Sequence, residues 1–127
     1  MKLRIVIADD NPAVLRQLVF LLGNEFEIVA TVPDGALALE AIRCFRPDVV
    51  VLDIKMPVLG GIELTKILQK ESDPPAVVIC SVENDQEFVE AAQHAGALGY
   101  VFKAHVAKDL IGAVKLAARG QSFASLL

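Results

Sequence analysis

The chain has 127 residues, of which 54% are hydrophobic and 22% charged, and its formal net charge is −4. This length suits one domain, since single domains commonly have ~100–150 residues, and the composition excludes a largely disordered chain. The acidic balance argues against direct nucleic-acid binding, which normally requires a basic face. No apolar run approaches the ~18–20 residues of a membrane span. The first apolar run ends at Asp9, too early for a signal peptide, so we expect a cytoplasmic protein.

The cysteines of the chain, Cys44 and Cys80, give no sign of a metal or redox site. Their spacing matches no metal-binding or redox motif, and nothing in the nearby sequence pairs them. Free cysteines are usually buried, so we expect both to be reduced, buried thiols.

Short apolar runs alternate with segments of helical periodicity along the whole chain. The apolar runs predict strands over residues 3–8, 26–31, 49–52, 77–80 and 98–102. A helix is expected after each strand: the first begins at Pro12 and ends at Gly23, the second opens at Asp34-Gly35, the third follows Gly60-Gly61, the fourth runs to Gly96 and the last stops near Gly120.

This alternation predicts an α/β fold with three layers, in which five helices cover both faces of a parallel sheet. Strands that are apolar throughout must be buried on both sides, which is typical of such sheets. The run at 26–31 alternates instead, so it should lie at an edge. The pattern fits a doubly wound, five-stranded, flavodoxin-like order of 2-1-3-4-5. We expect one domain over residues 1–121, followed by a tail or linker over 122–127.

Polar side chains follow four of the five predicted strands. Asp9 and Asp10 follow the first strand, Asp53 the third, Ser81 the fourth and Lys103 the fifth. The carboxyl ends of parallel strands form the ligand crevice of such sheets. Three carboxylates gathered there repel one another unless a cation neutralises them. Mg²⁺ suits this role because it prefers oxygen ligands.

A lysine and a hydroxyl beside the same cation indicate a transferred phosphoryl group. Its oxygens could be shared among the metal, the ammonium of Lys103 and the hydroxyl of Ser81. One carboxylate must then act as the nucleophile and form an acyl phosphate. We choose Asp53, because it is single and ends the middle strand beside the point where the strand order reverses.

Several motifs stand in an order and spacing that together are specific, although none is decisive alone. They are Asp9-Asp10, Asp53-Ile54-Lys55-Met56-Pro57 with Gly61, Ser81, and Gly99-Tyr100-Val101-Phe102-Lys103. With them the chain resembles, over nearly its whole length, the CheY-like receiver domains of bacterial two-component response regulators. The stretch Gly120-Gln121-Ser122-Phe123 is similar to the NarL/FixJ-like branch of that family.

The resemblance implies a role for each residue of the expected metal site. Asp53 matches the phosphoacceptor. Asp10 matches the direct ligand of Mg²⁺, and Asp9 the residue that helps through water. The backbone carbonyl of Lys55 matches the remaining protein ligand.

The resemblance also implies how phosphorylation is sensed and how long it lasts. Ser81 matches the switch hydroxyl, Tyr100 the aromatic residue that rotates inward with it, and Lys103 the lysine that pairs with the phosphoryl oxygens. Lys55 and Glu83 match the two positions that flank the site and modulate dephosphorylation.

The implied function is a phosphorylation-controlled switch, not a conventional enzyme, and the expected partners also follow from the resemblance. A sensor histidine kinase would supply the phosphoryl group. The fourth helix, fifth strand and fifth helix would form a homodimer face. Receivers of the NarL/FixJ-like branch precede a C-terminal helix-turn-helix DNA-binding output domain, which this chain lacks, so we expect a role in transcription regulation.

Several positions depart from the family pattern, and two of them concern the switch and the loop after Lys103. Val82 stands where alanine is usual, and its extra bulk could hinder the inward movement of Tyr100. Ala104 stands where many members have a proline with a cis bond, which puts the geometry of that loop in doubt.

Three alternative functions were weighed against this one. An aspartyl phosphatase is disfavoured because Lys55 stands where a second acid is typical. A flavodoxin is disfavoured because Asp9-Asp10 would repel the flavin phosphate. A receiver-like scaffold that no longer uses phosphorylation stays open as the minority interpretation.

Overall fold

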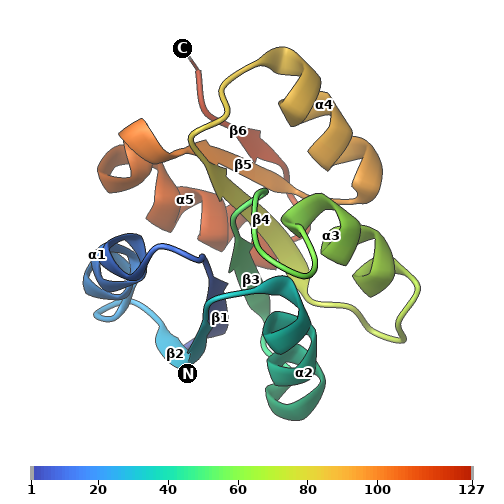
Figure 1. Ribbon diagram of the computed structural model, residues 1–127. Helices are drawn as coiled ribbons and strands as arrows, with labels where there is room; N and C mark the ends of the chain where they lie inside the picture. The colour runs from blue at the N-terminus through green and yellow to red at the C-terminus, as the bar shows by residue number, and fades with distance from the viewer. Residues whose placement is uncertain (1, 127) are drawn as a thin grey trace.

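The computed structural model describes residues 2–126 of the chain. Within that range strands and helices alternate from the first element to the last (Figure 1). The strands are β1 (Arg4–Ala8), β2 (Glu27–Val32), β3 (Val49–Leu52), β4 (Ala76–Ser81), β5 (Gly99–Phe102) and β6 (Phe123–Ala124). The helices are α1 (Pro12–Leu22), α2 (Gly35–Phe45), α3 (Gly61–Gln69), α4 (Gln86–Ala95) and α5 (Val106–Ala118), with a short 3₁₀ helix η1 (Lys103–His105) before α5.

All strands pair in parallel in one sheet of order β2-β1-β3-β4-β5-β6. The doubly wound order and the edge position of β2 are confirmed. The expected number of five strands was wrong by one, because β6 pairs with β5 at the other edge. This short strand lies in the segment 122–127, for which we expected a tail or linker; residue 127 itself is outside the described range.

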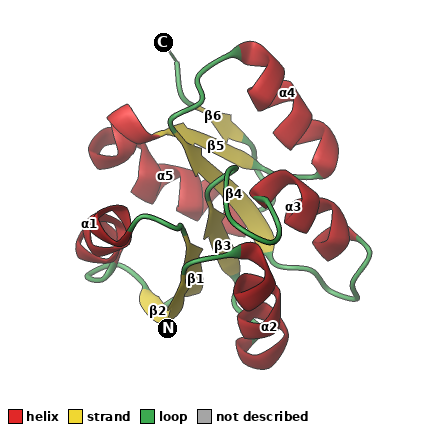
Figure 2. Ribbon diagram, in the orientation of Figure 1, coloured by secondary structure: helices red, strands yellow, loops and turns green. Residues whose placement is uncertain are grey.

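Helices cover both faces of the sheet, as Figure 2 shows, and each face has its own core cluster. Helices α2, α3 and α4 pack on one face, and α1 and α5 on the other. Strand β3 shows why the central runs are apolar throughout. Val50 and Leu52 belong to the first cluster, whereas Val49 and Val51 belong to the second. Side chains alternate along a strand, so a centrally placed strand needs apolar residues at every position.

The helices adjoining the carboxyl edge of β1 and β2 begin where the sequence predicts. The side chain of Asn11 accepts hydrogen bonds from the backbone N–H groups of Ala13 and Val14, and Pro12 occupies the first turn. Asp34 caps α2 in the same way by accepting from the N–H of Leu37. These caps satisfy helix N–H groups that lack partners within the helix, and so they fix where each loop at this edge ends.

The prediction for the cysteines was right for one residue and wrong for the other. Cys80 is 1% exposed within β4, whereas Cys44 is exposed on α2. Two residues of a helix span about 200°, so Cys44 points away from the face that carries the buried Ile42.

No helix in residues 2–126 is long and apolar enough to cross a membrane.

Candidate functional site

The carboxyl ends of β1 and β3 bring three acidic side chains together. Carboxylate oxygens of Asp9, Asp10 and Asp53 all lie within 4.8 Å of one another. Asp9 and Asp53 are only 1% and 7% exposed, whereas Asp10 is exposed. The sheet itself sets this arrangement, because the N–H of Asp53 donates to the carbonyl of Ala8 at 3.0 Å. The juxtaposition predicted from the strand ends is confirmed.

Lys103 reaches this acidic cluster from the end of β5, across the end of β4. Its Nζ lies 2.7 Å from Oδ2 of Asp9 and 3.1 Å from Oδ2 of Asp53. The Lys103 side chain is 16% exposed, so its ion pairs are poorly screened by water. One ammonium group thus faces three carboxylates, and the cluster keeps a negative balance.

The carboxylate oxygens differ in how well they are satisfied. Oδ1 of Asp53 accepts from the N–H of Ile54 at 2.8 Å, and Oδ1 of Asp9 accepts from the N–H of Asn11 at 2.9 Å. Oδ2 of Asp9 is buried and has no hydrogen-bond partner in the described chain. Its contact with Lys103 is close enough for an ion pair but lacks hydrogen-bond geometry. This ion pair compensates the burial of Oδ2 only in part, because the same ammonium also serves the buried Asp53, so the cluster can accept a further cation.

The pKa shifts at the site arise from burial and from the contacts between Lys103 and the two buried carboxylates. Burial raises the pKa of Asp53, and the nearby Asp9 adds to this, although Lys103 opposes it. Burial alone would lower the pKa of Lys103, but its contacts with Asp9 and Asp53 raise that pKa instead. The lysine is therefore held as a cation, and the ionised form of Asp53 is disfavoured as long as no second cation is nearby.

These residues fit a hard divalent cation. All three possible ligands are carboxylates, and hard divalent cations prefer oxygen ligands of this kind. Beside them an open cavity of about 610 Å³ is bounded by Asp10 and by residues of the β3–α3 loop. Asp9, Asp10 and Asp53 could hold such an ion, and this cavity could admit its water or phosphate ligands. The role of the Lys55 carbonyl as a ligand stays a prediction.

The β3–α3 loop is held against Asp53 by backbone features at Gly61 and Val58. A Cβ atom at Gly61 would lie 2.1 Å from the carbonyl oxygen of Asp53, so only glycine allows this approach. Val58 has φ +70°, and the N–H of Leu59 donates to the carbonyl of Pro57 at 2.7 Å. This is a three-residue turn in a conformation that a β-branched residue rarely adopts. This turn could not be predicted from the sequence, since valine is disfavoured in that conformation.

The predicted switch residues lie together beside the site. Ser81 is buried, and its Oγ accepts from the N–H of Glu83 at 3.1 Å. Tyr100 is 1% exposed, and its hydroxyl donates to the carbonyl of Glu83 at 2.7 Å, so the ring already lies inward. Burial raises the pKa of Tyr100 to about 12, which keeps the phenol a donor. Val82 is 70% exposed and does not obstruct the ring, contrary to our expectation.

Lys55 and Glu83, expected to flank the site, form an ion pair with 2.8 Å between Nζ and Oε1. The pair joins the β3–α3 loop to the β4–α4 loop. The Lys55 Nζ also lies 5.9 Å from the centre of the Phe88 ring. The hydrogen bond and charge of Glu83 raise the pKa of Lys55. The geometry that our prediction required is present, whereas its kinetic role stays a prediction.

Some polar contacts near the site were missed from the sequence. The Nδ1 of His105 lies 3.8 Å from Oδ2 of Asp109. Asp109 in turn accepts a hydrogen bond from Ser125, and both are buried. Ala104 lies in η1, and the described chain has no cis peptide bond. No sequence signal marks this group, because its members come from α5 and from the segment we took for a tail.

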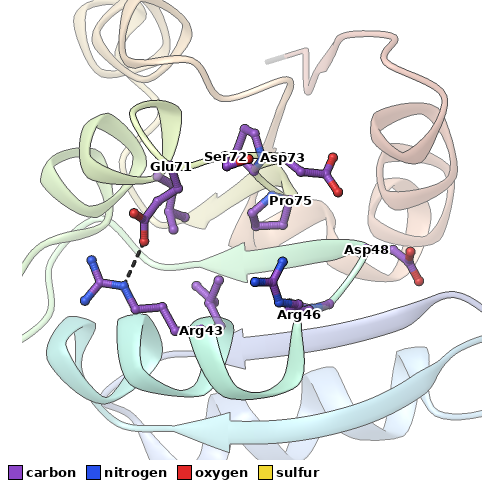
Figure 3. A pocket seen from close by; sticks show the side chains of 11 residues that line it. Arg43, Arg46, Asp48, Glu71, Ser72, Asp73 and Pro75 are labelled. Carbon is purple, nitrogen blue, oxygen red and sulfur yellow. Dashed lines mark hydrogen bonds and ion pairs between the residues drawn. The ribbon is translucent and has the colours of Figure 1, made fainter.

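The opposite, amino-terminal edge of the sheet has a cavity of its own, of about 500 Å³ (Figure 3). Its walls come from the end of α2 and from the segments that precede β3 and β4. Arg43 and Glu71 close one side with an ion pair of 2.7 Å. None of the predicted site residues lines it.

Comparisons with known proteins agree with this geometry. The sequence profile of the response regulator receiver domain matches residues 5–115. The transcriptional regulatory protein DegU of Brevibacillus brevis is 35% identical over 124 residues, covering 96% of this chain and 52% of that protein. The DNA-binding response regulator MtrA of Mycolicibacterium smegmatis is 34% identical over 115 residues, covering 91% and 50%. The chain thus spans about half the length of these relatives.

Solved structures agree as well. The receiver domain of the response regulator NarL from Mycobacterium tuberculosis superposes with a TM-score of 0.90 at 30% identity, over 94% of this chain and 98% of that one. A LuxR-family response regulator from Aurantimonas also gives a TM-score of 0.90, at 29% identity over 97% and 89%. The fold and both sets of comparisons agree, and the chain belongs to the family of response regulator receiver domains.

Proposed function

We propose that this domain accepts a phosphoryl group on Asp53 in a Mg²⁺-dependent reaction and signals by changing conformation. One observation carries the proposal: three carboxylates converge at this edge, and the single ammonium group of Lys103 contacts only two of them, Asp9 and Asp53. This charge deficit suits a divalent cation and the phosphoryl group that binds with it.

The residues of the site divide the chemistry among them. A carboxylate oxygen of Asp53 attacks the phosphorus of a phosphohistidine, forming an O–P bond as the N–P bond breaks and the imidazole leaves. Lys103, already 3.1 Å from Asp53, pairs with the oxygens of the transferred group. Mg²⁺, held by Asp9, Asp10, Asp53 and the carbonyl of Lys55, would neutralise the charge that collects there. The domain thereby catalyses its own phosphorylation and, with water as acceptor, its dephosphorylation.

The switch consists of Ser81 and Tyr100. Ser81 would turn its hydroxyl toward the phosphoryl group, exchanging its present hydrogen bond with the N–H of Glu83 for the new one. The inward position of Tyr100, fixed by its bond to the carbonyl of Glu83, is the one that we expect the phosphorylated domain to favour. The loop after β4 therefore links the two residues.

The proposed partners follow from the family and from the functions of its members. A sensor histidine kinase in the cytoplasm would donate the phosphoryl group. MtrA is described as a DNA-binding response regulator and DegU as a transcriptional regulatory protein, and both are about twice as long as this chain. This supports a C-terminal DNA-binding output domain after residues 1–121. A homodimer through α4, β5 and α5 is proposed too, with β6 lying at the edge of that face.

Labelling with a small phosphodonor tests the proposal. Acetyl phosphate should add one phosphoryl group to the protein, detected by intact mass spectrometry, only when Mg²⁺ is present. Asp53→Asn should abolish the addition, whereas Asp85→Asn, which changes an exposed carboxylate at the start of α4, should not. Equal labelling of the Asp53→Asn protein would rule out the assigned phosphoacceptor.

The ion pair of Lys55 and Glu83 is proposed to set the lifetime of the acyl phosphate. It spans the two loops that flank the site, where a hydrolytic water must approach in line with the phosphorus. Lys55→Ala and Glu83→Ala should each change the decay rate of the phosphorylated protein several-fold and leave Mg²⁺ affinity nearly unchanged. If decay is unchanged in both single variants and in the double variant, these side chains do not control access of water.

A further inference from the structure

Ser125 makes three hydrogen bonds at the edge of the sheet farthest from β2. Its N–H donates to the carbonyl of Tyr100 at 2.8 Å. Its Oγ accepts from the N–H of Phe102 at 3.2 Å and donates to Oδ2 of Asp109 at 2.7 Å. Ser125 is 6% exposed and Asp109 is 9% exposed, so water screens this group poorly.

These bonds fasten the C-terminal segment to β5 and α5. Strand β6 consists of only two residues, which pair with Gly99 and Tyr100 (Figure 1). Phe123 packs against the core on the α5 side, and Ala124 against the core on the α4 side. One position further on, the hydroxyl of Ser125 takes the place of a strand carbonyl as the acceptor for Phe102. The segment therefore covers the edge of β5 over its whole length.

Strand β5 is also connected to the phosphoacceptor site. Lys103 directly follows Phe102 and contacts Asp53 and Asp9. The hydroxyl of Tyr100 holds the loop after Ser81 through the carbonyl of Glu83. Tyr100 thus contacts the loop after Ser81 through its hydroxyl and Ser125 through its carbonyl. Phe102, whose N–H donates to Ser125, directly precedes Lys103. A change in the position of β5 must therefore affect both sets of contacts.

We propose that Ser125 and Asp109 form a latch that couples the C-terminal segment to phosphorylation of Asp53, and that phosphorylation tightens it. The proposal rests on the function proposed above. We infer its direction from Tyr100, which takes part in both sets of contacts: the inward ring binds the carbonyl of Glu83, and the carbonyl of the same residue binds Ser125 in the closed latch. Each then stabilises the other, and the coupling acts equally in both directions. The output domain proposed above would respond to the phosphorylation state through this contact.

Amide hydrogen exchange tests the latch, with beryllofluoride and Mg²⁺ as a mimic of the phosphoryl group. In the wild type, beryllofluoride should slow exchange in residues 123–126 about five-fold or more, the lower end of typical couplings between sites. Ser125→Ala should remove this response and weaken the affinity for beryllofluoride by a similar factor. Ser122→Ala is the matched control, because Ser122 is exposed on the same segment and should behave like the wild type.

The outcomes separate the latch from the phosphoacceptor site. If beryllofluoride slows exchange in residues 53–60 of the wild type but leaves 123–126 unchanged or faster, the latch is overturned and the proposed function stands. If residues 53–60 do not respond, both proposals are overturned. Should Ser125→Ala fail to fold, the wild-type comparison still decides, and Asp109→Asn serves as a second variant. Asn keeps an acceptor oxygen for Ser125, so this variant should respond as the wild type does.

Discussion

The two ends of the central sheet differ in how their charged side chains are paired. At the amino-terminal edge, Arg43 pairs with Glu71, and the guanidinium of Arg4 donates to the carbonyls of Phe45 and Arg46. At the carboxyl-terminal edge, the ammonium group of Lys103 contacts Asp9 and Asp53, two members of the cluster of three acids. At the first edge Arg43 and Arg4 both have partners. At the second edge there is an excess of negative charge that the described chain does not neutralise.

This difference shows that unbalanced charge, and not the presence of a cavity, identifies the functional end. Both edges have open cavities of similar size, about 500 and 610 Å³. Figure 3 shows the side chains of Arg43 and Glu71 turned toward each other at the first of them. Only at the second do buried carboxylates converge without enough cations. Buried carboxylates with too few cationic partners destabilise the fold, so their presence indicates a ligand that neutralises them.

The largest effect is expected on removing the one cation of the acidic edge. Lys103→Met leaves Asp9 and Asp53 buried without their ion pair, and the free energy of unfolding should fall by about 3 kcal/mol. Added Mg²⁺ should recover part of the loss, because it can replace the missing charge. Chemical denaturation measures both changes. Lys108→Met removes an exposed lysine of α5 and should have almost no effect; a comparable loss in that control would refute the explanation.

A smaller effect of opposite sign is expected on removing a negative charge from the same edge. Burial raises the pKa of Asp53, so its ionised form lowers the stability of the fold above that pKa. Without Mg²⁺, Asp53→Asn should raise the free energy of unfolding near neutral pH, within the ~0.5–2 kcal/mol common for stabilising substitutions. The gain should shrink as the pH falls toward about 4, the ordinary pKa of aspartate, where both states become protonated. A gain that persists unchanged at low pH would point to packing instead.

The smallest effect is expected at the other edge. Arg43→Ala breaks an exposed ion pair, whose side chains are 59% and 35% exposed, and should cost ~0.2–1 kcal/mol. High salt should remove most of the difference. Labelling of Asp53 should be unaffected, because the substituted residue lies at the far end of the sheet. Impaired labelling in this variant would mean that the two edges are coupled.

The sequence was sufficient for the strand order and for the acidic cluster. Apolar runs of four to six residues identify the buried strands, and parallel strands deliver whatever follows them to one edge. Asp9, Asp53 and Lys103 could be placed together for that reason alone. Their contacts follow from the topology and need no further information.

The sequence was not sufficient where long-range contacts override local preference. Phe123 and Ala124 are too few to form a recognisable strand, and they become one only because β5 offers a free edge. Val58 adopts a left-handed conformation that valine disfavours, held by the turn around it. The hydrogen bond of Ser125 to Asp109 joins residues sixteen positions apart, and neither has a local signal.

Thermal unfolding with increasing Mg²⁺ tests most directly whether the acidic edge is a cation site. At 100 times the dissociation constant, a ligand that binds only the folded state adds about 2.7 kcal/mol to its stability. Mg²⁺ should therefore raise the melting temperature of the wild type and of Arg43→Ala alike, and much less that of Asp10→Asn or Asp53→Asn. If Mg²⁺ stabilises all four proteins equally, or none of them, the charge deficit at the carboxyl edge is not a binding site for the metal.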